Sequence, residues 1–261
     1  MLWGAIVGDI VGSVYEFDNI KTKDFPLFSE HGFITDDSCM TIAVADSLMR
    51  WQRDGGDLQS AARKSMRTIG RRFPNMGYGF RFARWLDNDD NESYDSWGNG
   101  AAMRVSAVGW IGQSISEVKR LSYMVTSVSH DHIEGIKGAE ATAVSVFLAR
   151  TGRDKSDIAK YITENYYDWC LSVSELQENY EWEGSCQGSV PQALQCFIES
   201  TDFEDAIRNA ISIGGDSDTI GAITGAVAGA YYGVPDKIKT TARKYVPDEL
   251  LEIVDRFEGA L

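Results

Sequence analysis

The sequence predicts an all-α fold, a single compact domain of many helices that spans residues 1–261. Three observations support this prediction. Long segments repeat apolar residues with the three- to four-residue period of a buried helix face. The alternation of apolar and polar residues that is typical of strands is nearly absent, and only five prolines occur among the 261 residues. A chain of this length can bury a sizeable core.

The predicted helices occupy most of the chain, and each repeats apolar residues at intervals of three and four. Thr35 marks the start of one helix, because threonine is favoured at helix N-caps. Pro191 falls in the first turn of a later helix, where proline is tolerated. We therefore expect ten or so helices. Their ranges are 2–14, 36–51, 58–71, 101–109, 115–127, 133–150, 156–165, 190–199, 205–213 and 218–232, followed by a helix in the C-terminal tail.

Two of these segments carry glycines at four-residue spacing. Glycine destabilises a helix by about 1 kcal/mol relative to alanine, so two such stripes need a structural reason. A spacing of four places the glycines on one helix face, where another backbone can approach closely. We predict that the two helices lie in the core and touch each other; a membrane dimer motif is disfavoured because both segments are short and contain polar residues. The glycines are Gly4, Gly8, Gly12, Gly221, Gly225 and Gly229.

The chain is acidic, with 39 Asp and Glu residues against 25 Lys and Arg and a formal net charge of −14. This balance argues against binding to nucleic-acid phosphates, which requires a basic surface. The apolar stretches lack the length of a membrane-spanning helix and the basic residues of a signal peptide. We expect a cytoplasmic monomer without nucleic-acid or membrane contacts. The cysteines, expected to be buried thiols rather than disulfides, are Cys39, Cys170, Cys186 and Cys196.

Two short acidic segments stand where a loop meets an apolar helix: Thr-Asp-Asp-Ser at 35–38 and Asp-Ser-Asp-Thr at 216–219. One explanation is helix capping, since Asp, Ser and Thr are favoured at N-caps and acidic residues stabilise the first turn. However, a cap needs only one such side chain, and neighbouring carboxylates repel each other. The alternative is a ligand set made of oxygen atoms, which suits Mg²⁺, Mn²⁺ or Ca²⁺. If the two segments meet in space, they predict a two-metal site.

Glu16 directly follows the first glycine-bearing helix. By itself it is an ordinary polar residue at a helix end. If the glycine-bearing helices pack together, their ends bring Glu16 beside the acidic segment at 216–219. Glu16 is then a candidate carboxylate at the edge of the metal site.

A glycine loop, Gly98-Asn99-Gly100, precedes another predicted helix. Gly-Asn-Gly is common turn chemistry. The functional alternative is a nest of backbone N–H groups that binds a phosphate or diphosphate. The loop follows no strand and lacks the lysine of a phosphate-binding P-loop, so neither a P-loop nor a Rossmann site fits. Trp97 and Arg104 flank the loop and are candidates for stacking and for charge pairing, or for structural roles.

The sequence contains only three histidines, which disfavours a zinc site of the usual type. His130 and His132 flank Asp131 just before a predicted helix. Metal binding, a ligand contact and helix capping are all open for this pair. We favour a ligand contact for His130 and assign no role to His132. His31 is interpreted as a loop residue.

Several of these segments form a recognisable series: GAIVGDIVGSVYEF, FITDDSCMTIAVADSL, SWGNGAAMR, SHDHIEGIKGAEATA, SVPQALQCFIES and GGDSDTIGAITGAVAGAYYG. In this order they resemble the ADP-ribosylglycohydrolase family, which includes the glycohydrolase that reactivates dinitrogenase reductase. The resemblance extends to about Gly233, and the order TDD, GNGAAMR, GGDSDT is specific. It implies an all-α fold with two divalent cations, usually Mg²⁺ or Mn²⁺, at its centre.

The resemblance also implies roles for individual residues. Glu16 corresponds to a glutamate that senses or gates the substrate ribose. The glycine loop corresponds to one that holds the distal ribose and diphosphate of ADP-ribose, and His130 to a cleft histidine. Asp131 and Ile133 depart from the Asn and Pro of many relatives. The metal ligands would be Thr35, Asp36, Asp37, Asp216, Asp218 and Thr219, and the substrate-binding residues would be Gly98, Asn99, Gly100 and His130. To these we add Trp97 as a substrate-binding candidate, because its ring could stack beside the loop.

The implied reaction is hydrolysis of the glycosidic bond at the anomeric carbon of ADP-ribose. The reaction would release ADP-ribose from a modified protein side chain or from a small-molecule conjugate. Asp36, with Asp37 as the second choice, would accept the proton of the attacking water, and Glu16 would act at the leaving group. The alternative is a non-catalytic ADP-ribose-binding or crystallin-like structural member of the same family. The survival of all six metal positions and Glu16 favours an enzyme.

Overall fold

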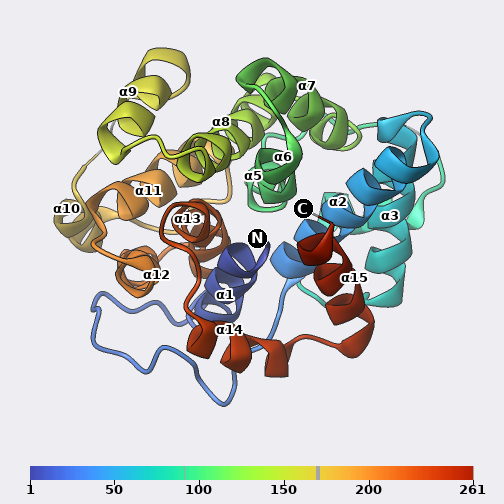
Figure 1. Ribbon diagram of the computed structural model, residues 1–261. Helices are drawn as coiled ribbons and strands as arrows, with labels where there is room; N and C mark the ends of the chain where they lie inside the picture. Colours follow the sequence, from blue (N-terminus) through green and yellow to red (C-terminus); the bar gives the residue numbers. More distant parts are fainter. Residues whose placement is uncertain (91, 169–170, 261) are drawn as a thin grey trace.

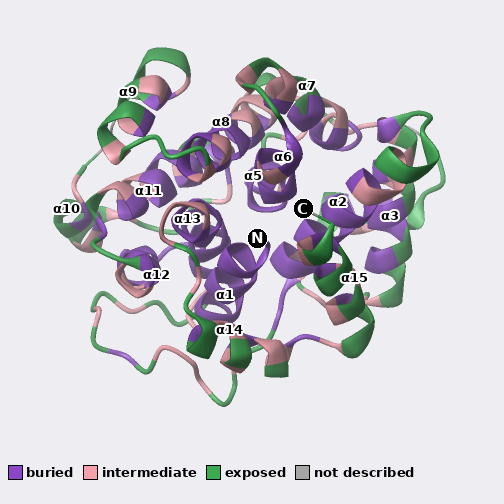
Figure 2. Cartoon of the chain, viewed as in Figure 1, coloured by how far each residue is buried: buried purple, intermediate pink, exposed green. Residues whose placement is uncertain are grey.

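Two glycine-bearing helices form the centre of the molecule. The computed structural model describes residues 1–90, 92–168 and 171–260. Helix α1 (Trp3–Gly12) and helix α13 (Ser217–Tyr232) lie side by side in the middle of the ribbon (Figure 1). Every residue of α1 is buried, and so is α13 up to Gly229 (Figure 2). The other helices surround this pair.

The glycines are the reason that α1 and α13 can pack so closely. A Cβ atom on Gly8 would lie 1.9 Å from the carbonyl oxygen of Gly221, and one on Gly4 would lie 2.1 Å from that of Gly225. At the other end of α1, a Cβ on Gly12 would lie 2.5 Å from the Cα of Asp218. The pairing is therefore antiparallel, and the prediction that the two stripes touch in the core is confirmed. It also brings the C-terminal end of α1 to the N-terminal end of α13.

The all-α prediction is confirmed. Helices α8, α11 and α12 pack against α13, while α2 and α14 pack against α1. Between residues 1 and 260, apart from 91 and 169–170, the regular structure is helical, and the chain forms one isolated bridge between Gly98 and Ser185. The surrounding helices are α2 (Asp36–Asp54), α3 (Leu58–Arg72), α4 (Phe80–Asp87), α5 (Gly100–Met103), α6 (Ser106–Ile111), α7 (Ile115–Thr126), α8 (Ile133–Arg150), α9 (Lys155–Asn165), α10 (Val173–Asn179), α11 (Cys186–Glu199), α12 (Phe203–Ser212), α14 (Asp236–Ala242), the 3₁₀ helix η1 (Arg243–Tyr245) and α15 (Asp248–Gly259).

The number of helices and some boundaries differ from the prediction. Fifteen α-helices are present in the described residues, because two short ones were missed and two expected helices are divided. The expected helix 101–109 breaks into α5 and α6, since Arg104 and Val105 have ψ angles of −5° and −1° rather than helical values. The C-terminal helix is divided into α14 and α15. The missed helices are α4 and α10.

Helix α11 begins earlier than predicted. The Ser185 side chain accepts a hydrogen bond from the Gly188 amide and so caps a helix that starts at Cys186. Pro191 therefore lies in the interior of the helix rather than in its first turn. There it lacks the N–H that would bond to the Gln187 carbonyl. The Pro191 ring is buried on the core side of the helix.

The chain has no helix, in the ranges that the structure describes, long and apolar enough to cross a bilayer. Cys39 and Cys186 are buried free thiols, as expected, and Cys196 is buried as well. Cys170 lies outside the described residues.

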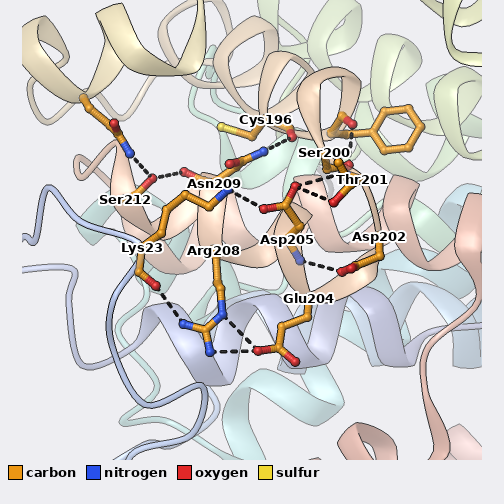
Figure 3. Close-up of polar contacts among 12 residues, drawn as sticks. Lys23, Cys196, Ser200, Thr201, Asp202, Glu204, Asp205, Arg208, Asn209 and Ser212 are labelled. Atoms are coloured by element: carbon orange, nitrogen blue, oxygen red, sulfur yellow. Dashed lines mark hydrogen bonds and ion pairs between the residues drawn. The ribbon is translucent and has the colours of Figure 1, made fainter.

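A long connection between α1 and α2 is fastened to α12 by polar contacts (Figure 3). The Arg208 guanidinium donates to the carbonyl oxygens of Lys23 and Phe25, at 2.8 Å each, and pairs with Glu204. The Lys23 ammonium pairs with Asp205. These contacts hold the middle of a connection whose two ends carry Glu16 and Thr35.

Candidate active site

A cleft of about 620 Å³ lies where α1, α2 and α13 begin or end. Its volume is in the range of pockets that hold small-molecule ligands. The cleft brings together almost all of the site residues predicted from the sequence. Those that line it are Glu16, Thr35, Asp36, Asp37, Gly98, Asn99, Gly100, His130, Asp216, Asp218 and Thr219.

The first acidic segment forms the N-terminal turn of α2. Thr35 is the N-cap, as predicted, and its hydroxyl accepts a hydrogen bond from the Asp37 amide at 3.2 Å. The segment is also held by Asp9 of α1, which is fully buried. The Asp9 carboxylate accepts from the Thr35 amide, from the Thr35 hydroxyl at 2.8 Å and from the Ser38 amide at 3.0 Å. Asp9 was not predicted as a site residue; the only signal was a charged residue inside an apolar helix.

Helix capping does not account for the second acidic segment. Asp216 is the N-cap residue of α13, yet its side chain makes no capping hydrogen bond. Its Oδ2 instead accepts from the Asn99 side chain at 2.7 Å, which joins the glycine loop to the acidic segment. The Thr219 hydroxyl reaches Oδ2 of Asp37 at 3.3 Å. The two acidic segments therefore meet, as the metal-site hypothesis requires.

The carboxylates form two overlapping groups. One oxygen each from Asp9, Asp37 and Asp218 lie within 4.8 Å of one another, and so do single oxygens from Glu16, Asp216 and Asp218. Burial raises the pKa of every one of these carboxyl groups. Neighbouring negative charges raise most of them further, and the pKa of Asp218 reaches about 7. A positive charge bound nearby would lower these pKa values and favour the ionised carboxylates.

The residues present fit a hard divalent cation. All side chains that converge here offer oxygen, which is the donor that Mg²⁺ and Mn²⁺ prefer. Oδ1 of Asp37 is buried and has no hydrogen-bond partner in the described structure. An unpartnered buried carboxylate oxygen is costly, and coordination to a cation would satisfy it. The acidic groups can therefore hold a metal.

Glu16 is half-buried at the edge of the acidic cluster. Burial, followed by the charges of Asp216 and Asp9, raises the pKa of Glu16 to about 7. Its backbone is fixed by Asn19, whose side-chain amide donates to the Glu16 carbonyl at 3.1 Å and to the Gly215 carbonyl at 2.9 Å. The Asn19 oxygen accepts from the Gly215 amide at 2.7 Å. Asn19 thus ties the segment that carries Glu16 to the loop that carries Asp216.

The glycine loop differs from the expected nest of backbone N–H groups. The Gly98 amide donates to the Ser96 hydroxyl and the Asn99 amide to the Gly184 carbonyl, so two of its three amides are already engaged. Helix α5, which follows, is a single turn. At Gly98 and Gly100 the loop has no side chains. A Cβ on Gly100 would lie 3.3 Å from Nε2 of His130, so the absence of a side chain there leaves the histidine ring uncovered.

His130 lies behind the glycine loop and is buried. Its ring packs against Tyr94, with ring centres 5.5 Å apart, and against Phe82 at 6.0 Å. Arg104 is also buried and stacks on Phe82 at 5.3 Å. Burial, and then the charges of Arg104 and Arg81, hold the pKa of His130 well below its usual range, so that the imidazole is neutral.

Two residues near the loop lie apart from the cleft. Trp97, a predicted substrate-binding residue, is not among the residues that line it; its ring packs against His132 at 5.2 Å. His132 is the N-cap of α8, where Nδ1 accepts from the Glu134 amide at 3.1 Å. Of the roles left open for His132, the structure therefore supports capping. Exposed aromatic side chains that sequence reasoning missed line the cleft instead: Phe17, Phe33, Phe80 and Trp182.

A sequence profile of the ADP-ribosylglycohydrolase family matches residues 1–261 of this chain. The chain belongs to the ADP-ribosylglycohydrolase family. The predicted resemblance is therefore confirmed, and it covers the whole chain rather than ending at about Gly233.

Similarity to individual ADP-ribosylglycohydrolases is low but covers most of the chain. The ADP-ribosylhydrolase ARH3 of Homo sapiens is 25% identical over 331 residues, which cover 96% of this chain and 90% of that protein. The ADP-ribosylarginine hydrolase Tri1 of Pseudomonas putida (strain GB-1) is 26% identical over 270 residues, which cover 89% of this chain and 70% of that protein. A solved structure, described as an ADP-ribosylglycohydrolase-related protein complex, has a TM-score of 0.67 at 24% identity and covers 94% of this chain and 96% of that one. This last likeness shows the shared fold.

Proposed function

We propose that this protein hydrolyses the glycosidic bond at the anomeric carbon of ADP-ribose and so releases ADP-ribose from a modified protein side chain or a small-molecule conjugate. One observation carries the proposal: two acidic segments, Glu16, the glycine loop and His130 line a single cleft. Family membership and the names of the relatives support an ADP-ribosylhydrolase at the coarser level. Of the two named relatives, only Tri1 has a name that specifies the linkage, to arginine, so the linkage is a question for experiment.

The acidic cluster is suited to two divalent cations, Mg²⁺ or Mn²⁺. Such cations supply charge stabilisation, orientation of sugar hydroxyls and a lowered pKa of bound water. The predominance of oxygen donors and the unpartnered Oδ1 of Asp37 support this assignment. The residues that would hold the cations are Thr35, Asp36, Asp37, Asp216, Asp218 and Thr219.

The protein side chains would then divide the proton transfers. Asp36 is partly exposed to the cleft, whereas Asp37 is only 2% exposed, so Asp36 is the better acceptor of the proton from an attacking water. Glu16, with a pKa of about 7, can hold a proton near neutral pH and deliver it to the leaving group. Asn99 would fix Asp216 through the hydrogen bond between them.

The remainder of the cleft would bind the two halves of the substrate. The glycine loop and His130 would hold the diphosphate, which places the anomeric carbon beside the acidic cluster. The exposed rings of Phe17 and Phe33 line the same cleft as Glu16. They would contact the group that is attached to ADP-ribose, so their surroundings are where specificity for the linkage would arise.

A panel of defined ADP-ribose conjugates tests the proposal. The panel should include arginine-linked, serine-linked, nucleobase-linked and O-acetyl-ADP-ribose, each with Mg²⁺, Mn²⁺ or chelator. We expect release of ADP-ribose from at least one conjugate with metal, loss of turnover in Asp36→Asn and Asp218→Asn, and little change in Asp54→Asn, an exposed aspartate of the same helix as Asp36. Full activity in chelator would contradict the metal assignment. Binding of ADP-ribose without turnover of any conjugate would support a non-catalytic binding protein instead.

A further inference from the structure

Three buried side chains form a hydrogen-bonded chain behind the glycine loop. The Arg104 guanidinium donates to the hydroxyl of Ser129 at 2.8 Å. The Ser129 hydroxyl lies 2.9 Å from Nδ1 of His130, and the same guanidinium nitrogen of Arg104 lies 3.4 Å from that Nδ1. All three residues are at most 4% exposed.

The hydrogen-bonding capacities of Arg104 and Ser129 determine which ring nitrogen of His130 carries the proton. A guanidinium can only donate, so Ser129 accepts from Arg104 and keeps its own hydroxyl proton for another acceptor. Nδ1 is the acceptor within reach. If Nδ1 carried the proton instead, it would face the donor groups of Arg104, and the Ser129 proton would lose this acceptor. Nδ1 is therefore unprotonated, and in a neutral imidazole the proton is then on Nε2.

Nε2 faces the substrate side of the ring. It lies 3.3 Å and 3.7 Å from the positions that Cβ atoms would occupy on Gly100 and Gly98. Among the described residues, the hydrogen bonds of the His130 side chain involve only Nδ1. An Nε2–H group therefore points at the side-chain-free surface of the loop, inside the cleft.

We propose that Arg104 and Ser129 are positioning residues that hold His130 in the tautomer protonated on Nε2, a neutral hydrogen-bond donor for an oxygen of the substrate diphosphate. The role of the diphosphate rests on the proposed function; the tautomer itself does not. The lowered pKa of His130 agrees with a neutral ring. Burial lowers the pKa of Arg104 to about 10, so Arg104 is still charged at neutral pH and remains a donor. Arg104 therefore acts on the substrate through His130.

Nuclear magnetic resonance tests the tautomer directly. Long-range ¹⁵N–¹H correlation spectra distinguish a protonated from an unprotonated ring nitrogen. The protein has only three histidines, and His31→Gln and His132→Gln variants assign the remaining signal to His130. We expect a single tautomer, protonated on Nε2, near neutral pH in the protein without ADP-ribose. A proton on Nδ1, or a doubly protonated ring, would overturn the proposal.

A Ser129→Ala variant tests the positioning role. Without the hydroxyl, we expect signals of both tautomers and about a five- to tenfold weaker affinity for ADP-ribose, the effect of one neutral hydrogen bond. Affinity for Mn²⁺ should be unchanged. Ser127→Ala is a matched control, because the Ser127 hydroxyl accepts from Gln59 rather than from the histidine chain. An unaltered His130 spectrum in Ser129→Ala would contradict the role of Ser129. If ADP-ribose does not bind the natural protein, the proposed function fails, while the spectra of the natural protein still decide the tautomer.

Discussion

The carboxylate of Asp9 accepts both protons that Thr35 can donate: the backbone amide at 3.0 Å and the hydroxyl at 2.8 Å. The hydroxyl also lies 3.2 Å from Oδ2 of Asp37, so the closer acceptor is Asp9. The Thr35 hydroxyl oxygen also accepts from the Asp37 amide. Because its proton is directed to α1, one lone pair of this oxygen is left for a cation in the cleft. Asp9 thus orients the first acidic segment from behind.

An Asp9→Asn substitution should weaken metal binding while the protein stays folded. The amide would set its own N–H groups against the Thr35 donors, and loss of such a supporting hydrogen bond typically reduces metal affinity by about 10- to 100-fold. Titration calorimetry with Mn²⁺ measures the change. Asp46→Asn is the matched control. Asp46 is also a buried carboxylate, on α2, and it accepts hydrogen bonds from Ser65 and Arg50. Its loss should lower stability without changing Mn²⁺ affinity. Equal Mn²⁺ affinity in Asp9→Asn and the natural protein would refute this role.

Removal of the Asn19 side chain should lower turnover more than metal binding. Asn19→Ala removes the side-chain hydrogen bonds that connect the Glu16 carbonyl to the backbone of Gly215. Glu16 would then lose its proposed position beside the scissile bond. We expect kcat to fall by about tenfold or more, with thermal stability little affected since Asn19 is exposed. Asn179→Ala is the control, because Asn179 makes a comparable helix-end bond to the Glu175 carbonyl far from Glu16 in sequence. A kcat equal to that of the control would count against Asn19.

The contact between α1 and α13 should not tolerate a methyl group. In Gly8→Ala the new Cβ would meet the Gly221 carbonyl oxygen at 1.9 Å, and neither backbone can move without separating the two central helices. We expect a loss of about 3 kcal/mol or more in the free energy of unfolding, measured by urea denaturation. Gly259→Ala, at a helix end with open space around it, should be neutral or slightly stabilising. A stable Gly8→Ala protein would show that the helices can separate freely.

The metal-free protein should lose stability as the pH rises. The pKa values of Asp9 and Asp218, about 6 and about 7, are raised above the 3.8 expected for an unfolded chain. The folded state therefore binds protons more tightly, and the stabilisation is lost as the pH rises through these values. We expect a lower Tm in chelator at about pH 8 than at about pH 5.5. Saturating Mg²⁺ should reduce the difference, because the cation replaces the protons. The opposite trend in chelator would contradict this explanation.

The sequence predicted which residues line the cleft better than it predicted the contacts that hold them in place. Asp36, Asp216 and Asp218 were recognisable because adjacent carboxylates exceed what a helix cap requires. Asp9 was not, since its role depends on Thr35, which reaches it only after folding. Trp97 was assigned to the substrate on residue type, whereas its ring packs on His132.

The sequence likewise predicted the main features of the fold better than its short helices and helix boundaries. The apolar period and the glycine stripes sufficed to predict the all-α class and the central pair of helices. The short helix α4 has few residues and an exposed Phe80, so its periodicity is weak. Helix α10 was missed although Ser172 and Glu175 form a capping box, a signal that is visible in the sequence. The division of 101–109 at Arg104 depends on buried contacts that no local pattern encodes.

The pairing of α1 with α13 has a consequence for folding during synthesis on the ribosome. Helix α1 is complete once Gly12 has been made, but the backbone that it packs against begins at Ser217. At translation speeds of about 5–20 residues per second, about ten seconds or more pass between the synthesis of α1 and that of α13. During that time its apolar surface lacks the helix that covers it in the folded protein. The cleft, which is lined by residues next to both helices, can form only after the N-terminal turn of α13 has been made.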